Sequence, residues 1–155
     1  MEISDLLSPD AVFANAKAAS KKQLLQDLSE RAASLTGIPQ RRIFETLNER
    51  ERLGSTGMGQ GVAIPHGHIE GVERMTGLFV RMGTPVEFEA MDEQPVDLVF
   101  LLLAPPGAGA DHLKALARAS RLLRNRSICE KLRAATDAAA LFALLTEPTA
   151  SSQAA

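Results

Sequence analysis

The chain has 155 residues, of which 45% are hydrophobic, and a formal net charge of −2 at pH 7. This length supports one well-buried core, and the dispersed acids and bases argue against a basic surface for nucleic acid or a polybasic segment for anionic lipid. The single cysteine, Cys129, excludes an internal disulfide and a cysteine-based zinc site, and an acidic start without a long apolar stretch predicts a cytoplasmic protein.

Two amphipathic helices are predicted in the first third of the chain. Ser20 has the position of an N-cap, and apolar residues then recur at helical spacing until Gly37. Pro39 suits the first turn of a second helix that ends near Leu53 and has an apolar face formed by Ile43, Phe44 and Leu47.

Strands are predicted in the middle of the chain. Residues 62–64 form a short extended segment, and residues 75–82 have the composition of a strand. Residues 86–90 are expected to form a short edge strand. Residues 96–104 are almost all Leu, Val and Phe, which indicates a central strand covered on both faces.

Helices are predicted again after residue 110. Asp111 is a plausible N-cap for a helix that continues to about Arg124, and shorter helices are expected at 127–134 and 137–145. Residues 148–155 are small and polar, as in a frayed tail. Strands interleaved with helices predict a helix-covered sheet of the α/β or α+β class, with the strand order left open.

The most distinctive segment is the glycine-rich loop at residues 54–67, which holds five of the eleven glycines. Such a cluster indicates unusual backbone dihedrals or close approach to another molecule. Pro65 keeps Ile64 out of helical geometry, so His66 is expected at a strand end. A neutral imidazole offers a lone pair for attack on phosphorus or for binding a metal. We therefore predict a functional role for His66, with an anion beside it as the first candidate ligand.

Two other side chains occupy positions that are suggestive of function. His112 lies in the first turn of its predicted helix and points inward, where a helix N-terminus favours anions; simple core packing is the alternative. Arg50 shares a helix face with buried apolar residues, so its guanidinium forms either a structural ion pair or an anion site. His68 is expected to be a solvated side chain on a loop.

Other chemistries find less support in the sequence. A metal site of His66, His68 and His112 is a rival interpretation, but it lacks the tight helical spacing and nearby carboxylate of catalytic zinc sites. Ser55 lacks the nucleophile elbow of serine hydrolases, and the glycine loop lacks the Gly-Lys-Ser/Thr ending of a nucleotide-binding P-loop.

The loop and its flanks resemble a known family. The run Arg50-Glu51-Arg52-Leu53-Gly54-Ser55-Thr56-Gly57 and the run Gly61-Val62-Ala63-Ile64-Pro65-His66-Gly67 are similar to the enzyme IIA component of the bacterial phosphoenolpyruvate-dependent phosphotransferase system, fructose/mannitol type. Within that family the nitrogen-regulatory branch matches best. Residues 94–100 and 111–123 match the family's buried strand and following helix, and the resemblance covers roughly residues 4–146.

The resemblance implies a fold and a site. The fold would be a single α/β domain over residues 1–147, with a mixed β-sheet flanked by α-helices on both faces, the site at one sheet edge and a disordered tail at 148–155. His66 would be the phosphoacceptor, forming a tele-phosphohistidine, while His112 and Arg50 would hold the phosphoryl oxygens. The Ser55 or Thr56 hydroxyl and glycine N–H groups would add phosphate contacts. No cofactor and no metal are implied.

The function implied by the resemblance is that of a nitrogen-regulatory phosphocarrier, not a multiple-turnover enzyme acting on a small molecule. Its partners would be a phosphohistidine carrier protein (HPr-like) and regulated targets such as kinases or potassium transport components, with no nucleic acid and no direct membrane insertion. Two alternatives remain. One is a sugar-specific enzyme IIA that passes the phosphoryl group to a membrane permease, and the other is a non-catalytic anion-sensing module.

Overall fold

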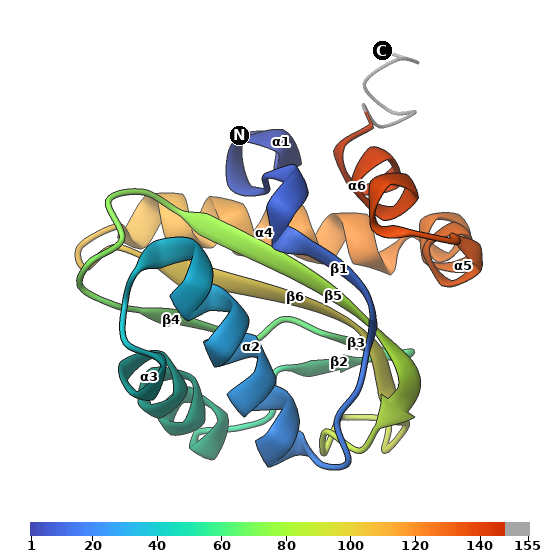
Figure 1. The fold of residues 1–155 in the computed structure, drawn as a ribbon, viewed down its shortest axis with the longest axis horizontal. Coiled ribbons are helices and arrows are strands. Elements are labelled where there is room, and N and C mark those ends of the chain that lie inside the picture. The colour runs from blue at the N-terminus through green and yellow to red at the C-terminus, as the bar shows by residue number, and fades with distance from the viewer. Residues whose placement is uncertain (148–155) are drawn as a thin grey trace.

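Strand β6 (Val96–Ala104) lies at the centre of a mixed sheet in the computed structural model, which describes residues 1–147 (Figure 1). It pairs antiparallel with β5 (Thr76–Val86) on one side. On its other side it pairs parallel with the two short strands β3 (Val62–Ala63) and β4 (His66–His68). A run of Val, Leu and Phe suits this position because helices cover both faces of the strand.

Two further strands complete the sheet at its edges. Strand β1 (Val12–Ala16) runs parallel to β5, and β2 (Gly57–Gly59) runs antiparallel to β3. The order is therefore β1-β5-β6-β3-β2, with β4 beside β6 beyond the end of β3. The mixed sheet implied by the family resemblance is confirmed.

β3 and β4 behave as one interrupted strand. Both pair with β6 at the same offset of 36 residues, so the register resumes unchanged after Ile64 and Pro65. Successive residues of such a strand point to opposite faces of the sheet. His66 and His68 therefore share one face, and Gly67 lies on the other.

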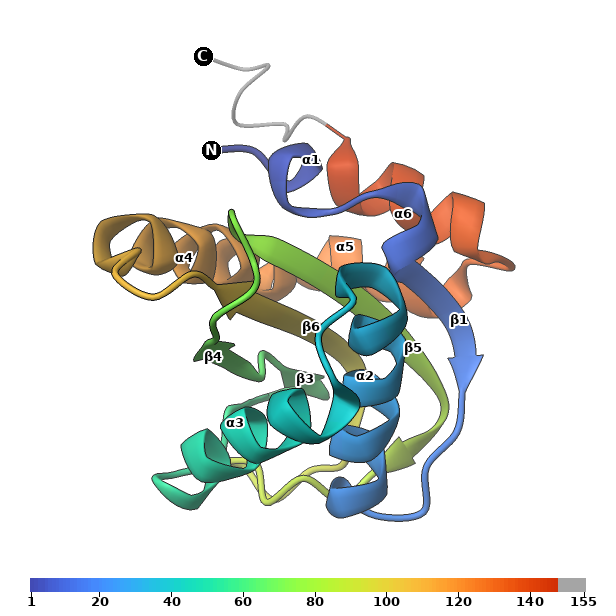
Figure 2. The same ribbon diagram turned by 60° about the vertical axis from the view of Figure 1, so that its left-hand side comes forward.

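Helices form a layer on each face of the sheet, as Figures 1 and 2 show. Helices α2 (Lys21–Thr36) and α3 (Gln40–Arg52) cover one face. The other is covered by α1 (Ile3–Leu6), a 3₁₀ turn at Pro9–Ala11, α4 (Gly109–Arg124), α5 (Arg126–Ala134) and α6 (Ala138–Thr146).

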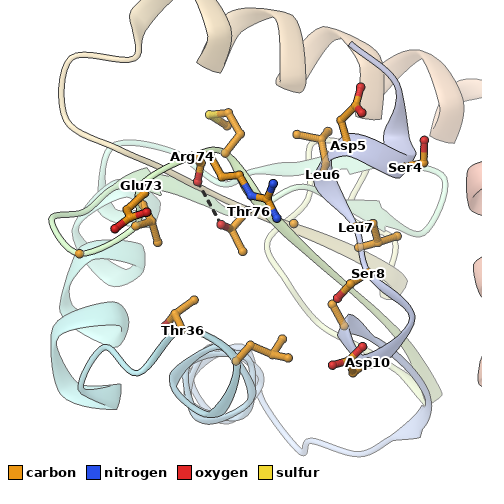
Figure 3. Close-up of a pocket in the computed structure, with 16 residues that line it drawn as sticks. Ser4, Asp5, Leu6, Leu7, Ser8, Asp10, Thr36, Glu73, Arg74 and Thr76 are labelled. Carbon is orange, nitrogen blue, oxygen red and sulfur yellow. Dashed lines mark hydrogen bonds between the residues drawn. The ribbon is translucent and has the colours of Figure 1, made fainter.

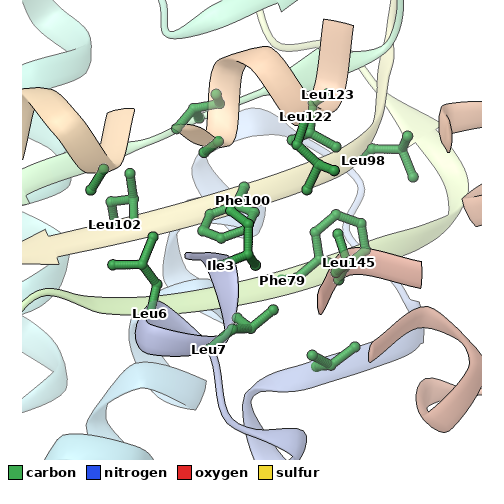
Figure 4. Close-up of a cluster of buried hydrophobic side chains, with 14 of the residues drawn as sticks. Ile3, Leu6, Leu7, Phe79, Leu98, Phe100, Leu102, Leu122, Leu123 and Leu145 are labelled. Atoms are coloured by element: carbon green, nitrogen blue, oxygen red, sulfur yellow. The ribbon is translucent and has the colours of Figure 1, made fainter. Parts of the chain in front are cut away.

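The side chains of β6 divide between the two layers. Leu98, Phe100 and Leu102 pack in the cluster on the α4 face, and Val99, Leu101 and Leu103 pack in the cluster on the α2–α3 face. Figure 4 shows the first cluster, in which side chains of β5 and β6 meet those of α1, α4 and α6. At about 1.5–3 kcal/mol for each fully buried large apolar side chain, these clusters hold both layers to the sheet.

Most predicted elements are confirmed, with shifted ends. Helix α2 has Ser20 as its N-cap and ends at Gly37 with φ 78°, as expected. The 96–104 strand is confirmed at both ends. The helix predicted from Asp111 begins instead at Gly109, with Ala108 as N-cap, so the expected cap was wrong and Asp111 lies in the first turn.

Several features differ from the sequence-based expectation. No edge strand forms at 86–90, because β5 continues to Val86 and the chain then buries Phe88 in a loop. Strands β1 and β2 were not predicted, and the segment taken as a loop after Pro65 is β4. The expected disordered tail at 148–155 lies outside the described residues. No helix within residues 1–147 has the length and apolarity to cross a membrane.

Gly67 is where α3 approaches β4 most closely. A Cβ at this position would lie 2.6 Å from Thr46 Cγ2, and Thr46 is held because its hydroxyl donates to the Arg42 carbonyl. We expect Gly67→Ala to lower the free energy of unfolding by about 1–3 kcal/mol, the usual cost of overpacking. Urea unfolding is the measurement.

Two variants control this prediction. Thr46→Ser removes the clashing methyl group, so it should restore part of the loss in the double variant. Gly109→Ala adds a Cβ with nothing within 4 Å and should not destabilise the protein. A Gly67→Ala protein as stable as the wild type would contradict the close packing of α3 on β4.

Candidate functional site

The turn from α3 into the glycine loop is held by a buried carboxylate, that of Glu51. Its Oε1 accepts the Thr56 backbone N–H at 3.1 Å and lies 3.0 Å from Lys21 Nζ. The Thr56 hydroxyl donates to the other carboxylate oxygen. Because both Glu51 and Thr56 are buried, this network fixes where the loop leaves the helix.

This network also changes the β-ladder beside it. The Ile64 N–H donates to the Thr56 carbonyl at 3.1 Å. In an antiparallel pair of this kind the reciprocal bond would run from the Thr56 N–H to the Ile64 carbonyl. The Thr56 N–H donates to Glu51 instead, which leaves the Ile64 carbonyl for another donor.

His66 Nδ1 is that donor. It lies 2.8 Å from the Ile64 carbonyl oxygen. A carbonyl only accepts hydrogen bonds, so the proton of the neutral ring sits on Nδ1 and the lone pair on Nε2. Burial lowers the pKa of His66 below its ordinary value, and the positive charge of Arg50 acts in the same direction. The half-buried ring is therefore neutral at pH 7, with Nε2 ready to act as a nucleophile.

His112 reaches the same face of the sheet from α4. Its ring is buried, and its centroid lies 5.4 Å from that of His66 in an edge-on arrangement. Nδ1 lies 2.8 Å from His68 Nε2, whereas Nε2 is buried with no hydrogen-bond partner among the described residues. Burial, followed by the neighbouring histidines, lowers the pKa of His112 to about 4.

Arg50 approaches from α3, on the other side of β4. Its half-buried side chain donates from Nη1 to the Gly54 carbonyl at 2.9 Å, and its charge acts on His66. Among the ion pairs formed within residues 1–147, none involves Arg50. The alternative of a structural ion pair is thus not the arrangement found, and the guanidinium is bonded to the loop.

Ser55 and Thr56, the other two predicted phosphate contacts, have hydroxyl groups that already serve the loop. The Ser55 hydroxyl donates to the Phe88 carbonyl at 2.7 Å and accepts the Gly57 N–H at 3.0 Å. The Thr56 hydroxyl donates to Glu51. In this arrangement both side chains brace the loop, and a phosphate contact from either stays a prediction.

Sequence reasoning missed two members of this site. His68 is exposed, as expected, but it is not an isolated loop side chain, because it lies on β4 against His112 with ring centroids 4.3 Å apart. The alternation of His66 and His68 was the signal, and it required that this segment be taken as a strand. Glu51 lies in a run of charged residues, where nothing in the sequence distinguishes the buried one.

A separate cleft lies away from the histidines. It has a volume of about 590 Å³ and opens between α1, the end of α2 and the segment that leads into β5. Figure 3 shows Arg74 and Thr76 on one side and Ser8 and Thr36 on the other. None of the three histidines lines it. Within residues 1–147, no three His, Cys, Asp or Glu side chains are arranged to hold a metal ion.

The geometry thus unites a half-buried neutral histidine, a second histidine and an arginine. A family model described as "Phosphoenolpyruvate-dependent sugar phosphotransferase system, EIIA 2" matches residues 5–147. The chain belongs to this family. It is an enzyme IIA domain, and the family expected from the loop sequence is confirmed.

Known enzyme IIA relatives resemble the chain along most of its length. It is 57% identical over 150 residues to a "Nitrogen regulatory protein" of Bradyrhizobium diazoefficiens, covering 97% of this chain and 98% of the relative. A crystal structure of the nitrogen regulatory protein IIA-Ntr from Neisseria meningitidis superposes with a TM-score of 0.88 at 38% identity, over 93% of this chain and 99% of that one. A fructose-specific EIIA component from Haloferax volcanii is 32% identical over 132 residues, 84% of this chain and 86% of that protein.

Acid is expected to destabilise the protein through His112. The folded-state pKa is about 4 against 6.5 for the free side chain, so the unfolded chain binds more protons between these values. The contribution of His112 to stability is complete above about pH 6.5 and is lost as the pH falls towards 4. Urea unfolding should show a loss of about 2 kcal/mol from this group between about pH 7 and pH 5. Because glutamine does not titrate, the loss of unfolding free energy over this pH range should be smaller by that amount in His112→Gln. An equal loss in the variant and the wild type would contradict the assignment of this pH dependence to His112.

Glu51→Ala is expected to release the Thr56 N–H to compete for the Ile64 carbonyl. The Nδ1–H tautomer of His66 would then lose its fixed partner, and ¹⁵N NMR of the imidazole should show a mixture of tautomers. The variant should also lose about 1–3 kcal/mol of stability, because the buried donors lose their acceptor. Glu49→Ala, on the exposed face of the same helix, is the control. Unchanged His66 nitrogen shifts in Glu51→Ala would show that Glu51 does not direct the histidine.

Proposed function

We propose that this enzyme IIA domain is a nitrogen-regulatory phosphocarrier that accepts a phosphoryl group on His66 Nε2. The observation that carries the proposal is the 2.8 Å bond from His66 Nδ1 to the Ile64 carbonyl, which leaves Nε2 as the nucleophile of a neutral ring. The donor is a phosphohistidine carrier protein, because one imidazole can pass the group to another without a change of chemical class.

The transfer exchanges one nitrogen–phosphorus bond for another. The Nε2 lone pair of His66 forms the new bond while the bond to the carrier imidazole breaks, and the bonding pair returns to the carrier nitrogen. No proton has to move on His66, because Nδ1–H stays on the Ile64 carbonyl. As the ring becomes positive, that hydrogen bond becomes charge-assisted and strengthens.

Arg50 and His112 supply the groups that bind the phosphoryl oxygens. Phosphoryl transfer has a loose transition state with charge on the equatorial oxygens, so the site mainly positions the group and offsets that charge. Arg50 comes from one helical layer and His112 from the other, so they approach His66 from two sides. Each charge-assisted bond would contribute about 1.5–3 kcal/mol. Backbone N–H groups of the glycine loop complete the cradle, with Ser55 and Thr56 as its nearest hydroxyl groups.

The surface beside these groups suits a protein partner. Leu53, which precedes the loop, is 84% exposed, and Leu113, next to His112, is 69% exposed. Met58, within the glycine loop, is half-buried and packs against the core. A dianion placed near exposed apolar side chains changes such a surface strongly. Regulated targets, such as kinases or potassium transport components, would read this change in the cytoplasm.

The second candidate function is that of a sugar-specific enzyme IIA, which the similarity to a fructose-specific EIIA component supports. It shares the acceptor step on His66 and differs in the next acceptor, a membrane permease. The higher identity to a nitrogen regulatory protein favours the regulatory output. Transfer from the phosphorylated chain to the cytoplasmic domain of a sugar permease would favour the second candidate.

The acceptor step is tested by incubating the protein with phosphoenolpyruvate, the first enzyme of the relay and the carrier. We expect intact-mass analysis to show one added phosphoryl group that is acid-labile and base-stable, and it should be absent from His66→Ala. Its persistence in that variant would overturn the assignment. A wild-type protein that never gains the group would favour the anion-sensing module.

The roles of Arg50 and His112 are tested by the rate of the same reaction. Arg50→Ala and His112→Ala should fold but acquire the phosphoryl group about ten- to a hundredfold more slowly, the factor for losing one charge-assisted bond. Arg52→Ala removes an exposed cation two residues from Arg50 and is the matched control. Wild-type rates in the Arg50 and His112 variants would assign both residues a structural role only.

A further inference from the structure

His68 shares the site face because of the strand register. In β4, His66 and His68 alternate with Gly67, and the interrupted strand keeps its offset relative to β6. Gly67 faces Thr46 of α3, so the two histidines face the layer that contains α4. His112 of α4 therefore meets both, with ring centroids 5.4 Å from His66 and 4.3 Å from His68.

The contact between His68 and His112 constrains where protons lie. The 2.8 Å separation of His68 Nε2 and His112 Nδ1 requires one proton between two nitrogens in the neutral pair. If His112 held that proton, its Nε2 would be a bare lone pair and would repel phosphoryl oxygens. If His68 holds it, His112 Nδ1 accepts, and His112 Nε2 carries the proton that a phosphoryl oxygen needs.

The position of this proton matters because it decides whether the other ring nitrogen of His112, Nε2, is a hydrogen-bond donor. His112 Nε2 is buried, and no group within residues 1–147 bonds to it. Buried polar atoms without a partner are rare and costly, so His112 Nε2 is a position where a hydrogen bond to a ligand would be favourable. The negative oxygens of a phosphoryl group on His66, one ring away, require a donor there.

We infer that His68 is a positioning residue that donates Nε2–H to His112 Nδ1 and so holds His112 as an Nε2–H donor towards the phosphoryl group on His66. The inference rests on the proposed function of His66 and extends it to a residue outside the family motif.

The same hydrogen bond gives the buried ring a route for protons. A phosphoryl group draws a proton to its neighbours, and His112 is almost closed to solvent whereas His68 is exposed. A proton that binds at His68 Nδ1 lets the proton on His68 Nε2 pass to His112 Nδ1. The pair then carries one positive charge on His112, and His112 Nε2 keeps its proton throughout, so the donor survives the change of charge.

Few other charged groups compete in this exchange. His66 and His68 of β4 are the neighbours that shift the pKa of His112, and both lower it in the resting protein. Arg50 and Glu51 of α3 act on His66 with opposite signs. Asp111 precedes His112 in the first turn of α4. The negative phosphoryl group would be the new charge that raises the pKa of His112.

The resting hydrogen bond is tested in the unphosphorylated protein by ¹⁵N NMR of the imidazole rings. We expect a protonated Nε2 and an accepting Nδ1 on His112. His68→Lys, whose ammonium group only donates, should preserve this tautomer, and His68→Phe should give a mixture. A proton on His112 Nδ1 in the wild type, or identical shifts in His68→Phe, would overturn the inference.

The proton route is tested by the lifetime of the phosphoryl group on His66 at several pH values. His68→Phe should shorten the lifetime about tenfold, the factor for one hydrogen bond. The side chain in His68→Gln can form a hydrogen bond to His112 but cannot take up a proton. As the pH falls from about 8 to about 6, the lifetime in the wild type should therefore rise relative to the lifetime in His68→Gln. Glu70→Gln, an exposed neighbour, should match the wild type. Equal pH profiles in wild type and His68→Gln would overturn the route.

The two measurements separate this inference from the proposed function. If the wild type acquires no phosphoryl group on His66, the phosphocarrier role fails, and the tautomer of His112 still decides the arrangement of the histidine pair. If His68→Phe does not fold, His68→Lys and the wild-type tautomer decide it.

Discussion

The buried carboxylate of Glu51 is the constraint on which the site depends. Glu51 accepts the Thr56 N–H, which removes one hydrogen bond from the ladder between the glycine loop and the interrupted strand. The Ile64 carbonyl accepts a hydrogen bond from His66 instead. The tautomer of the candidate nucleophile is thus fixed by a side chain at the end of a helix, through two backbone groups. Lys21 of α2 compensates the charge of Glu51, so the second helix of this layer is tied to the same point.

The register of β4 against β6 distributes the site over two layers. Because Gly67 faces α3 and its flanking histidines face the opposite layer, the nucleophile meets His112 from α4 on its own face and Arg50 from around the sheet edge. A site assembled from both layers is sensitive to their relative position. The closest approach of α3 to β4 lies at a residue without a side chain, where a methyl group would separate them.

How much of the fold and of the site could be predicted from the sequence depends on how far apart in the sequence the interacting residues lie. Ser20 and Gly37 bound α2 through contacts within a few residues, and β6 is apolar enough to identify a covered strand, so local pattern sufficed. His66, His112 and Arg50 were identified because each conflicts with its local setting. Strand β1 is short and contains Asn15 with φ 60°, and only its pairing with β5 makes it a strand. Glu51 and His68 acquire their roles from partners five and 44 residues away. Alternation along β4 reveals His68 only once the segment is known to pair with β6.

The resting site holds two features that a phosphoryl group would affect in opposite senses. His112 Nε2 has no hydrogen-bond partner within residues 1–147, a deficit of about 1–3 kcal/mol for a buried polar atom, and a phosphoryl oxygen would remove it. Arg50 has a partner, the Gly54 carbonyl, and would have to exchange or share that bond to reach the same oxygens. The first effect would favour the phosphorylated form, and the second would link it to the loop, because the carbonyl that Arg50 would release belongs to Gly54. In the proposed function, the His112 half of the site would therefore favour retention of the group, while the Arg50 half would convey its presence to the surface beside Leu53, where a partner would bind.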